Sequence, residues 1–172
     1  ERIQLSLLAV DTHGYTNVAM AFAKMVGFDL CPQLRDLTER TLYLPRNFEV
    51  PESLDKIARL EVSIKGIFEG WDEMLRIGAS IHIGRISATV ALQRFGSAAR
   101  RDPVHKAADH LGRLLRTLFL CDFFSNPEFR REIHAILGRG ESVHLLQRAI
   151  YSSASTCNLF RPHSRRPRPT AR

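Results

Sequence analysis

Two acids, Asp11 and Glu141, have the settings best suited to chemistry in this sequence. Asp11 directly follows an apolar run, residues 5–10, and precedes a short turn that contains Gly14. Such an acid can bind a ribose hydroxyl, serve as a turn or capping residue, or ligate a hard divalent cation, which prefers carboxylate oxygens on a rigid element. Composition leaves these three interpretations open.

Glu141 lies where we expect the last helix of the chain to begin. His144 at i+3 and Arg148 at i+7 share its face. A carboxylate beside two potentially cationic groups suits a metal-bound phosphate. The alternative is an ordinary first-turn glutamate, stabilised by the helix dipole. A separate apolar stripe on this helix comprises Val143, Leu146 and Ile150.

The three cysteines, Cys31, Cys121 and Cys157, are far apart and form no CxxC pair. This spacing predicts neither a disulfide framework nor a zinc site. We expect Cys31 and Cys121 to be buried structural residues.

Length, composition and charge bound the class of protein. The 172 residues suffice for one domain with a real core, and no apolar run approaches the roughly 20 residues of a membrane span. Five arginines in residues 161–172 account for most of the net charge of +7; removing them from the 25 basic residues leaves 20 against 18 acidic. We therefore expect a soluble, cytoplasmic protein, and charge alone does not establish nucleic-acid binding.

The N-terminal part predicts a strand, helix, strand unit. Residues 3–10 form an apolar run too continuous for a half-exposed strand, which predicts burial on both faces. Thr16 can cap a helix that Gly27 ends. Residues 28–31 or 41–44 could then return as a strand.

Beyond a loop that begins at Pro45, residues 54–151 show helical periodicity almost throughout. We expect helices over 64–82 and over 87–95. The first has Phe68, Trp71 and Leu75 in the core, on a side that carries Ile64, Ile67, Phe68, Trp71, Leu75, Gly78 and Ala79. Asp102 and Pro103 start the clearest helix, with Leu118 among its inward residues. Asn126 and Pro127 start another, which the Gly138 to Gly140 stretch should end. The sequence beyond residue 152 loses periodicity and predicts a disordered tail.

Several stretches together resemble the C-terminal catalytic region of the Tn3-family transposases. The resemblance covers residues 5–151 in order. The matching stretches are "LLAVDTHGYTNVAMAFAKMVGFDLCPQLRDL", "LYLPR", "RDPVHKAADHLGRLLRTLFLCDFF" and "NPEFRREIHAILGRGESVHLLQRAIY".

The resemblance implies an α/β, partial RNase H-like fold, with the fourth and fifth strands plus helices, and a large, mostly α-helical insertion that makes the chain predominantly helical. It implies that Asp11, in "VDTHGYT", is the second acid of a DDE triad and that Glu141, in "RGESVHLLQRAIY", is the last. The corresponding segments are a core with the second-acid strand, the insertion, helices carrying the final Glu, and a disordered basic tail: 1–45, 46–125, 126–151 and 152–172.

By resemblance, two Mg²⁺ ions held by carboxylates would activate a water and then a DNA 3′-hydroxyl during cleavage and strand transfer. Asp11 and Glu141 would be metal ligands, and His13, His144 and Arg148 are candidates for DNA contact. The implied partners are transposon-end and target DNA and a homo-oligomer with intact transposase, with no membrane. The implied setting is the bacterial cytoplasm, associated with the nucleoid.

Two departures from the family pattern lead us to expect an inactive fragment. No residue matches the family's first Asp, which belongs on an earlier strand, and the sequence after "RAIY" no longer follows the family. Metal binding should then be weakened or absent. The alternative function is a non-catalytic remnant that binds DNA or an intact transposase.

Overall fold

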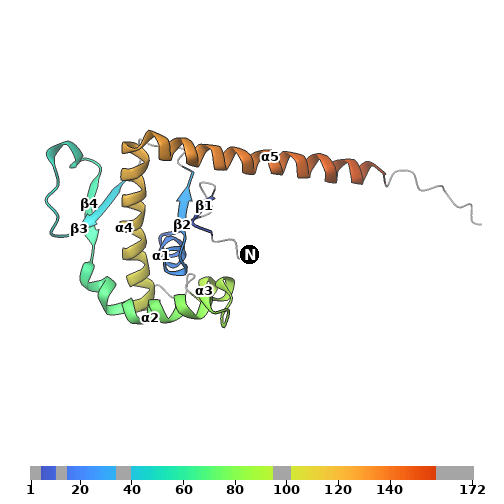
Figure 1. The fold of residues 1–172 in the computed structure, drawn as a ribbon. Helices are drawn as coiled ribbons and strands as arrows, with labels where there is room; N and C mark the ends of the chain where they lie inside the picture. The colour runs from blue at the N-terminus through green and yellow to red at the C-terminus, as the bar shows by residue number, and fades with distance from the viewer. Residues whose placement is uncertain (1–4, 11–14, 34–39, 95–101, 158–172) are drawn as a thin grey trace, which may run out of the picture. The chain divides into compact units, whose positions relative to one another are not determined.

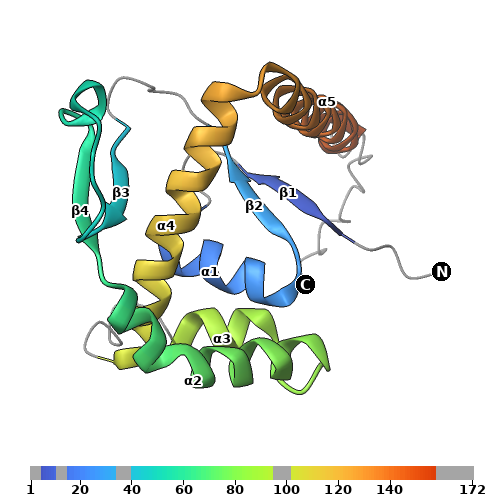
Figure 2. The same cartoon turned by 60° about the vertical axis from the view of Figure 1, so that its left-hand side comes forward.

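The computed structural model describes residues 5–10, 15–33, 40–94 and 102–157, and its ribbon is shown in Figures 1 and 2. Helices dominate this part of the chain, and two small parallel sheets accompany them. The contacts divide the chain into two compact units, Glu1–Leu137 and Gly138–Arg172.

The first sheet belongs to a β-α-β unit, as predicted. β1 (Leu7–Val10) pairs in parallel with β2 (Asp29–Pro32), and α1 (Asn17–Val26) connects them. The Thr16 hydroxyl accepts a hydrogen bond from the Ala19 N–H at 3.1 Å and so caps α1. Gly27 ends it with a φ of 107°, a left-handed conformation that glycine adopts without strain.

The prediction that the first strand is buried on both faces is wrong for the described residues. Leu5 and Leu8 are exposed, and Leu8 lines an open apolar groove with Phe28 and Leu30. Within the described part of the chain β1 hydrogen-bonds to β2 alone, and the described residues leave its other edge and part of one face uncovered.

The second sheet corrects the expectation of helix beyond Leu54. β3 (Leu42–Pro45) pairs in parallel with β4 (Ala58–Val62), and a short 3₁₀ helix, Glu52–Leu54, lies in their connection. Ala58 and Val62 are buried while the residues between them are exposed. The strand is thus anchored at its ends, and its exposed middle gives a weak burial pattern.

α2 (Ile64–His82) and α3 (Ala88–Arg94) follow. α2 forms where predicted, but its buried face is rotated from the expected one. Phe68 is 71% exposed and Leu75 is 46% exposed, so their placement in the core is wrong. α2 packs against α4 and α1. Ile67 and Gly78 are buried there as predicted, together with Gly70 and Met74, which were not predicted.

α4 (Pro103–Ser125) is the central helix of the first unit. It contacts α1, α2, β3 and β4, and Figure 2 shows it passing between the two strand pairs. The Asp102 carboxylate accepts from the Val104 N–H at 2.8 Å, which confirms the predicted cap. Leu118, expected to face inward, is 53% exposed, because the buried face of α4 runs through Thr117, Phe119 and Leu120.

α5 (Pro127–Cys157) begins as predicted but does not end at Gly138 to Gly140. The Asn126 carboxamide oxygen accepts from the Glu128 and Phe129 N–H groups at 3.0 and 3.1 Å. The helix continues through Glu141 to Cys157, beyond the point where we predict a disordered tail. Residues 158–172 lie outside the described residues.

The predicted four-segment division has no direct counterpart among these contacts and stays a prediction.

Two clusters of buried side chains form the core of the first unit. One joins α1, β4, α2 and α4, and the other joins α1, β2, α4 and the start of α5. The α1 to α4 contact is shared by both, so these two helices organise the unit.

Candidate functional site

Asp11 and His13 lie outside the described residues, so only their neighbours can be placed. Val10 is the last residue of β1 and pairs with Pro32, the last residue of β2. In α/β proteins, ligands bind at the carboxyl ends of parallel strands. The segment that contains Asp11 follows this edge directly in the chain.

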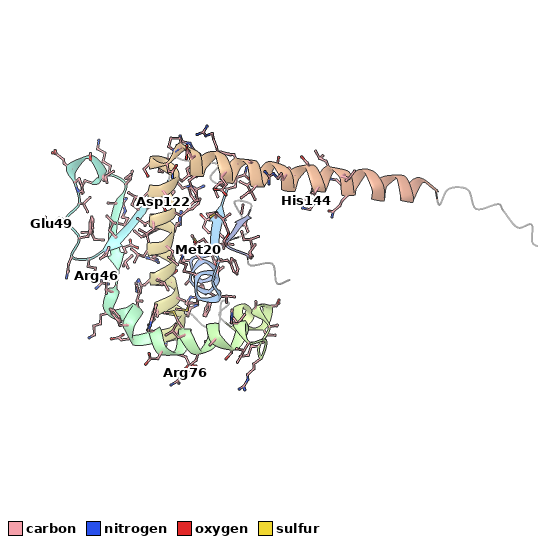
Figure 3. The ribbon with its side chains drawn as sticks, viewed as in Figure 1. Met20, Arg46, Glu49, Arg76, Asp122 and His144 are labelled. Carbon is pink, nitrogen blue, oxygen red and sulfur yellow. The ribbon has the colours of Figure 1, made fainter. Side chains whose placement is uncertain are left out.

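Glu141, His144 and Arg148 are all exposed on α5, and Figure 3 labels His144 there. Their spacing places them on one helix face. Within the described residues, no hydrogen bond or ion pair engages the Glu141 carboxylate. The helix is continuous from Pro127, so Glu141 is not in its first turn. The alternative interpretation of Glu141 as a first-turn glutamate stabilised by the helix dipole is therefore wrong.

A second group of polar residues, on the inner side of α4, was missed by the sequence reasoning. Arg113 pairs with Glu61 at 2.7 Å and with Asp109 at 2.8 Å. Asp109 also accepts a hydrogen bond from the Asn17 side chain at 2.9 Å. The contact between Arg113 Nε and the Asp109 carboxylate is an ion pair whose geometry does not meet that of a hydrogen bond. These carboxylates therefore neutralise Arg113.

Arg116, one turn further along α4, shares the Tyr43 ring with Arg113, whose guanidinium carbon lies 5.1 Å from the ring centre, but no carboxylate pairs with Arg116 among the described residues. Its guanidinium carbon lies 5.9 Å from the centre of the Tyr15 ring and 5.7 Å from that of Tyr43, within the range of cation–π attraction. Its Nε is buried and has no hydrogen-bond partner in the described structure. A signal did exist in "GRLLRTL", where two arginines three residues apart interrupt an apolar helix.

Thr117 fixes β3 against α4 beside this arginine. Its hydroxyl accepts from the Tyr43 N–H at 2.8 Å and lies 3.0 Å from the Tyr43 carbonyl, to which it can donate. The Tyr43 backbone is thus tied to α4, and the Tyr43 ring lies over Arg113 and Arg116 of that helix.

Burial also shifts the pKa values of several groups. Burial raises the pKa of the Cys31 thiol to about 12, which keeps it protonated and unreactive. Cys121, expected to be buried, is exposed. Burial, and then the charge of Arg113, lowers the pKa of His110. The neutral ring of His110 accepts a long hydrogen bond from the Ser63 N–H, at 3.4 Å.

Two kinds of feature are absent from the part of the chain that the structure describes. No three His, Cys, Asp or Glu side chains there gather closely enough to hold a metal ion. No helix there combines the length and the apolar character that crossing a membrane requires. The metal-ligand roles of Asp11 and Glu141 remain predictions.

Comparison with known proteins gives consistent matches along most of the chain. A family model described as the Tn3 transposase DDE domain matches residues 1–159. The transposase for insertion sequence element IS1071 in transposon Tn5271 of Comamonas testosteroni is 47% identical over 152 residues, which are 88% of this chain and 16% of that protein. The transposase for transposon Tn501 of Pseudomonas aeruginosa is 36% identical over 141 residues, 82% of this chain and 14% of that protein.

This chain thus spans only about one sixth to one seventh of the length of these relatives. The matched region nevertheless includes the segments with Asp11 and Glu141, the β-α-β unit and all the described helices. The chain therefore belongs to the family of Tn3 transposase DDE domains.

Proposed function

We propose that this chain forms part of the catalytic domain of a transposase that cleaves DNA at transposon ends and joins the 3′ ends to target DNA. The match to the transposase DDE domain over residues 1–159 carries this proposal. In it, β1, α1 and β2 belong to an RNase H-like core. Asp11 is the acid that follows a core strand, and Glu141 is the final acid.

The residues fit Mg²⁺ in the chemistry of their donors. Carboxylate oxygens are the ligands that Mg²⁺ prefers, and the exposed Glu141 carboxylate is not engaged by another described side chain. When bound, Mg²⁺ would activate a hydroxyl nucleophile and neutralise charge on the phosphate.

The chain's own cations would act on the DNA backbone. Arg148 can form two parallel hydrogen bonds with a phosphate, and His144 can donate one from the same face of α5. His13, next but one to Asp11, is the third candidate. These residues would hold the phosphate while the displacement takes place.

A chimeric transposase tests this proposal. The matching segment of the Comamonas testosteroni relative is replaced by this chain, and transposition is counted in cells. We expect the chimera to transpose, and Asp11→Ala and Glu141→Ala each to reduce transposition to background, because each removes a ligand.

Glu128→Gln is the matched control, since it removes another exposed acid from the same helix. It should retain activity. Retained transposition in Asp11→Ala or Glu141→Ala, with normal protein levels, would contradict the assigned roles.

The second candidate function is association with DNA or with intact transposase without catalysis. The exposed apolar side chains of Val143, Leu145 and Leu146 favour it, because such groups commonly mark interaction surfaces. An inactive but well-expressed chimera, together with co-purification of the separate chain and the intact relative, would support this function over the first.

A further inference from the structure

Two arginines on α4, only one turn apart, differ in how their charges are balanced. Arg113 is paired with both Glu61 and Asp109. Within the described residues no carboxylate pairs with Arg116, although its Nε is buried. Burying an unbalanced charge is costly, so a positive group in this situation suits an anionic ligand.

The surroundings of Arg116 hold its guanidinium in place. The rings of Tyr15 and Tyr43 both lie within 6 Å of it, and Thr117 fixes the Tyr43 backbone to the same turn of α4. An ordered, planar guanidinium is well matched to a phosphate, because it presents parallel donors and little side-chain entropy remains to be lost.

The position in the chain indicates which anion would bind. Tyr15 comes directly after the segment that contains Asp11. Two further arginines flank β3 in the chain: Arg40, whose buried Nε has no hydrogen-bond partner among the described residues, and the exposed Arg46, labelled in Figure 3. β3 packs against α4, so arginines on α4 and flanking β3 suit a charged polymer better than a single small ion.

We propose that Arg116, held by Tyr15 and Tyr43, binds a backbone phosphate of DNA. This inference rests on the proposed function, because it takes DNA as the substrate. Arg116 is a binding residue in this account, and Arg113 is a structural one that supports α4.

The salt dependence of DNA binding measures the contact directly. The 172-residue chain is titrated with a fluorescent 25-base-pair duplex of arbitrary sequence over a range of salt concentrations. The slope of log K against log salt concentration reports the number of phosphates neutralised, at about 0.9 per contact. We expect Arg116→Gln to reduce this slope by about 0.9, and Arg116→Lys to retain it because the charge remains.

Arg113→Gln is the matched control, because it removes an arginine from the same helix face that is already neutralised. Its slope should equal that of the unchanged chain. Circular dichroism verifies folding of each variant. If Arg116→Gln is unfolded, Arg116→Met takes its place, since it keeps an aliphatic stem against the two rings, and the same loss of slope is expected.

The outcomes separate this inference from the proposed function. An unchanged slope in the folded Arg116 variant would show that the arginine only packs between the rings, and would leave the transposase proposal intact. An equal loss of slope in Arg113→Gln would also overturn the assignment to Arg116. If the unchanged chain binds no DNA at low salt, the inference and the direct role of this chain in DNA binding both fail.

Discussion

α4 and the part of α5 beyond Gly138 are both helices that contain glycine, but the glycines have opposite surroundings. A Cβ on Gly112 in α4 would overlap the backbone oxygen of Asn17 in α1. A Cβ on Gly138 or Gly140 in α5 would meet nothing within 4 Å. The same residue type thus permits a close helix contact in α4 and only weakens the helix in α5.

The comparison extends to apolar residues. α4 buries Phe119, Leu120 and Phe123 against its neighbours. The α5 segment leaves Val143, Leu145 and Leu146 exposed by 54%, 62% and 62%. α4 therefore obtains its stability from packing, whereas the α5 segment depends on the local preferences of its residues.

Gly112→Ala should have the largest effect. Alanine favours a helix by about 1 kcal/mol over glycine, but here its methyl group would overlap the backbone of α1 and force the helices apart. We expect a net destabilisation of roughly 3 kcal/mol, at the upper end for overpacked cores. Urea denaturation measures it, and a variant as stable as the unchanged chain would show that the α1 to α4 contact is not as close as described.

Thr117→Val should cause the next largest loss of stability. It keeps the shape of the side chain but leaves the Tyr43 N–H without its partner, which costs about 1–3 kcal/mol in a part-buried position. Thr117→Ser retains the hydroxyl and loses one methyl group, for about 0.8 kcal/mol. If the serine variant is the less stable of the two in urea, packing rather than the hydrogen bond holds β3 to α4.

Gly138→Ala should act in the opposite direction from Gly112→Ala. With open space around it, the new methyl group costs nothing and the helix gains about 1 kcal/mol. Amide hydrogen exchange near residues 138–148 should slow about fivefold, while the urea midpoint of the first unit stays the same. Faster exchange there would indicate a helix contact that the open surroundings do not show.

Acidification should produce the smallest effect, through His110, which lies within α4 next to Ser63. Its pKa is lowered in the folded state, so the unfolded chain binds the proton more readily. The contribution of His110 is fully favourable above its ordinary pKa of 6.5 and is lost as the pH falls through the lower folded value. The contribution of His110 is measured by comparing the free energies of unfolding of the unchanged chain and of His110→Gln at several pH values. If the variant loses stability on acidification to the same extent, other groups cause the effect.

The elements with chemical start and stop signals were predictable from the sequence. Thr16 and Gly27 bound α1, Asp102 and Pro103 begin α4, and Asn126 begins α5, as the rules for helix ends require. Each signal acts through hydrogen bonds within a few residues, so no knowledge of the rest of the fold is needed.

The predictions from sequence failed mainly where contacts between residues far apart in the chain determine the structure. β4 forms because β3 and α4 lie beside it, and the rotation of α2 follows from its contacts with α4. The two glycines in α5 were overrated as a stop, because each costs only about 1 kcal/mol in a segment otherwise rich in helix formers. For the candidate site, motif resemblance supplied Asp11 and Glu141, whereas Arg116 stood out only once the rings of Tyr15 and Tyr43 were placed.

The central position of α4 also has a consequence for synthesis on the ribosome. The hydrogen bond from Asn17 to Asp109 joins residues 92 positions apart in the chain. The hydrogen bond from the Tyr43 N–H to Thr117 spans 74 positions. At about 5–20 residues per second, α1 emerges roughly 5–20 s before the helix that covers it. During that interval α4 is not yet present to cover the apolar faces of the earlier strands and helices. We therefore expect chaperones to bind the nascent chain at this stage.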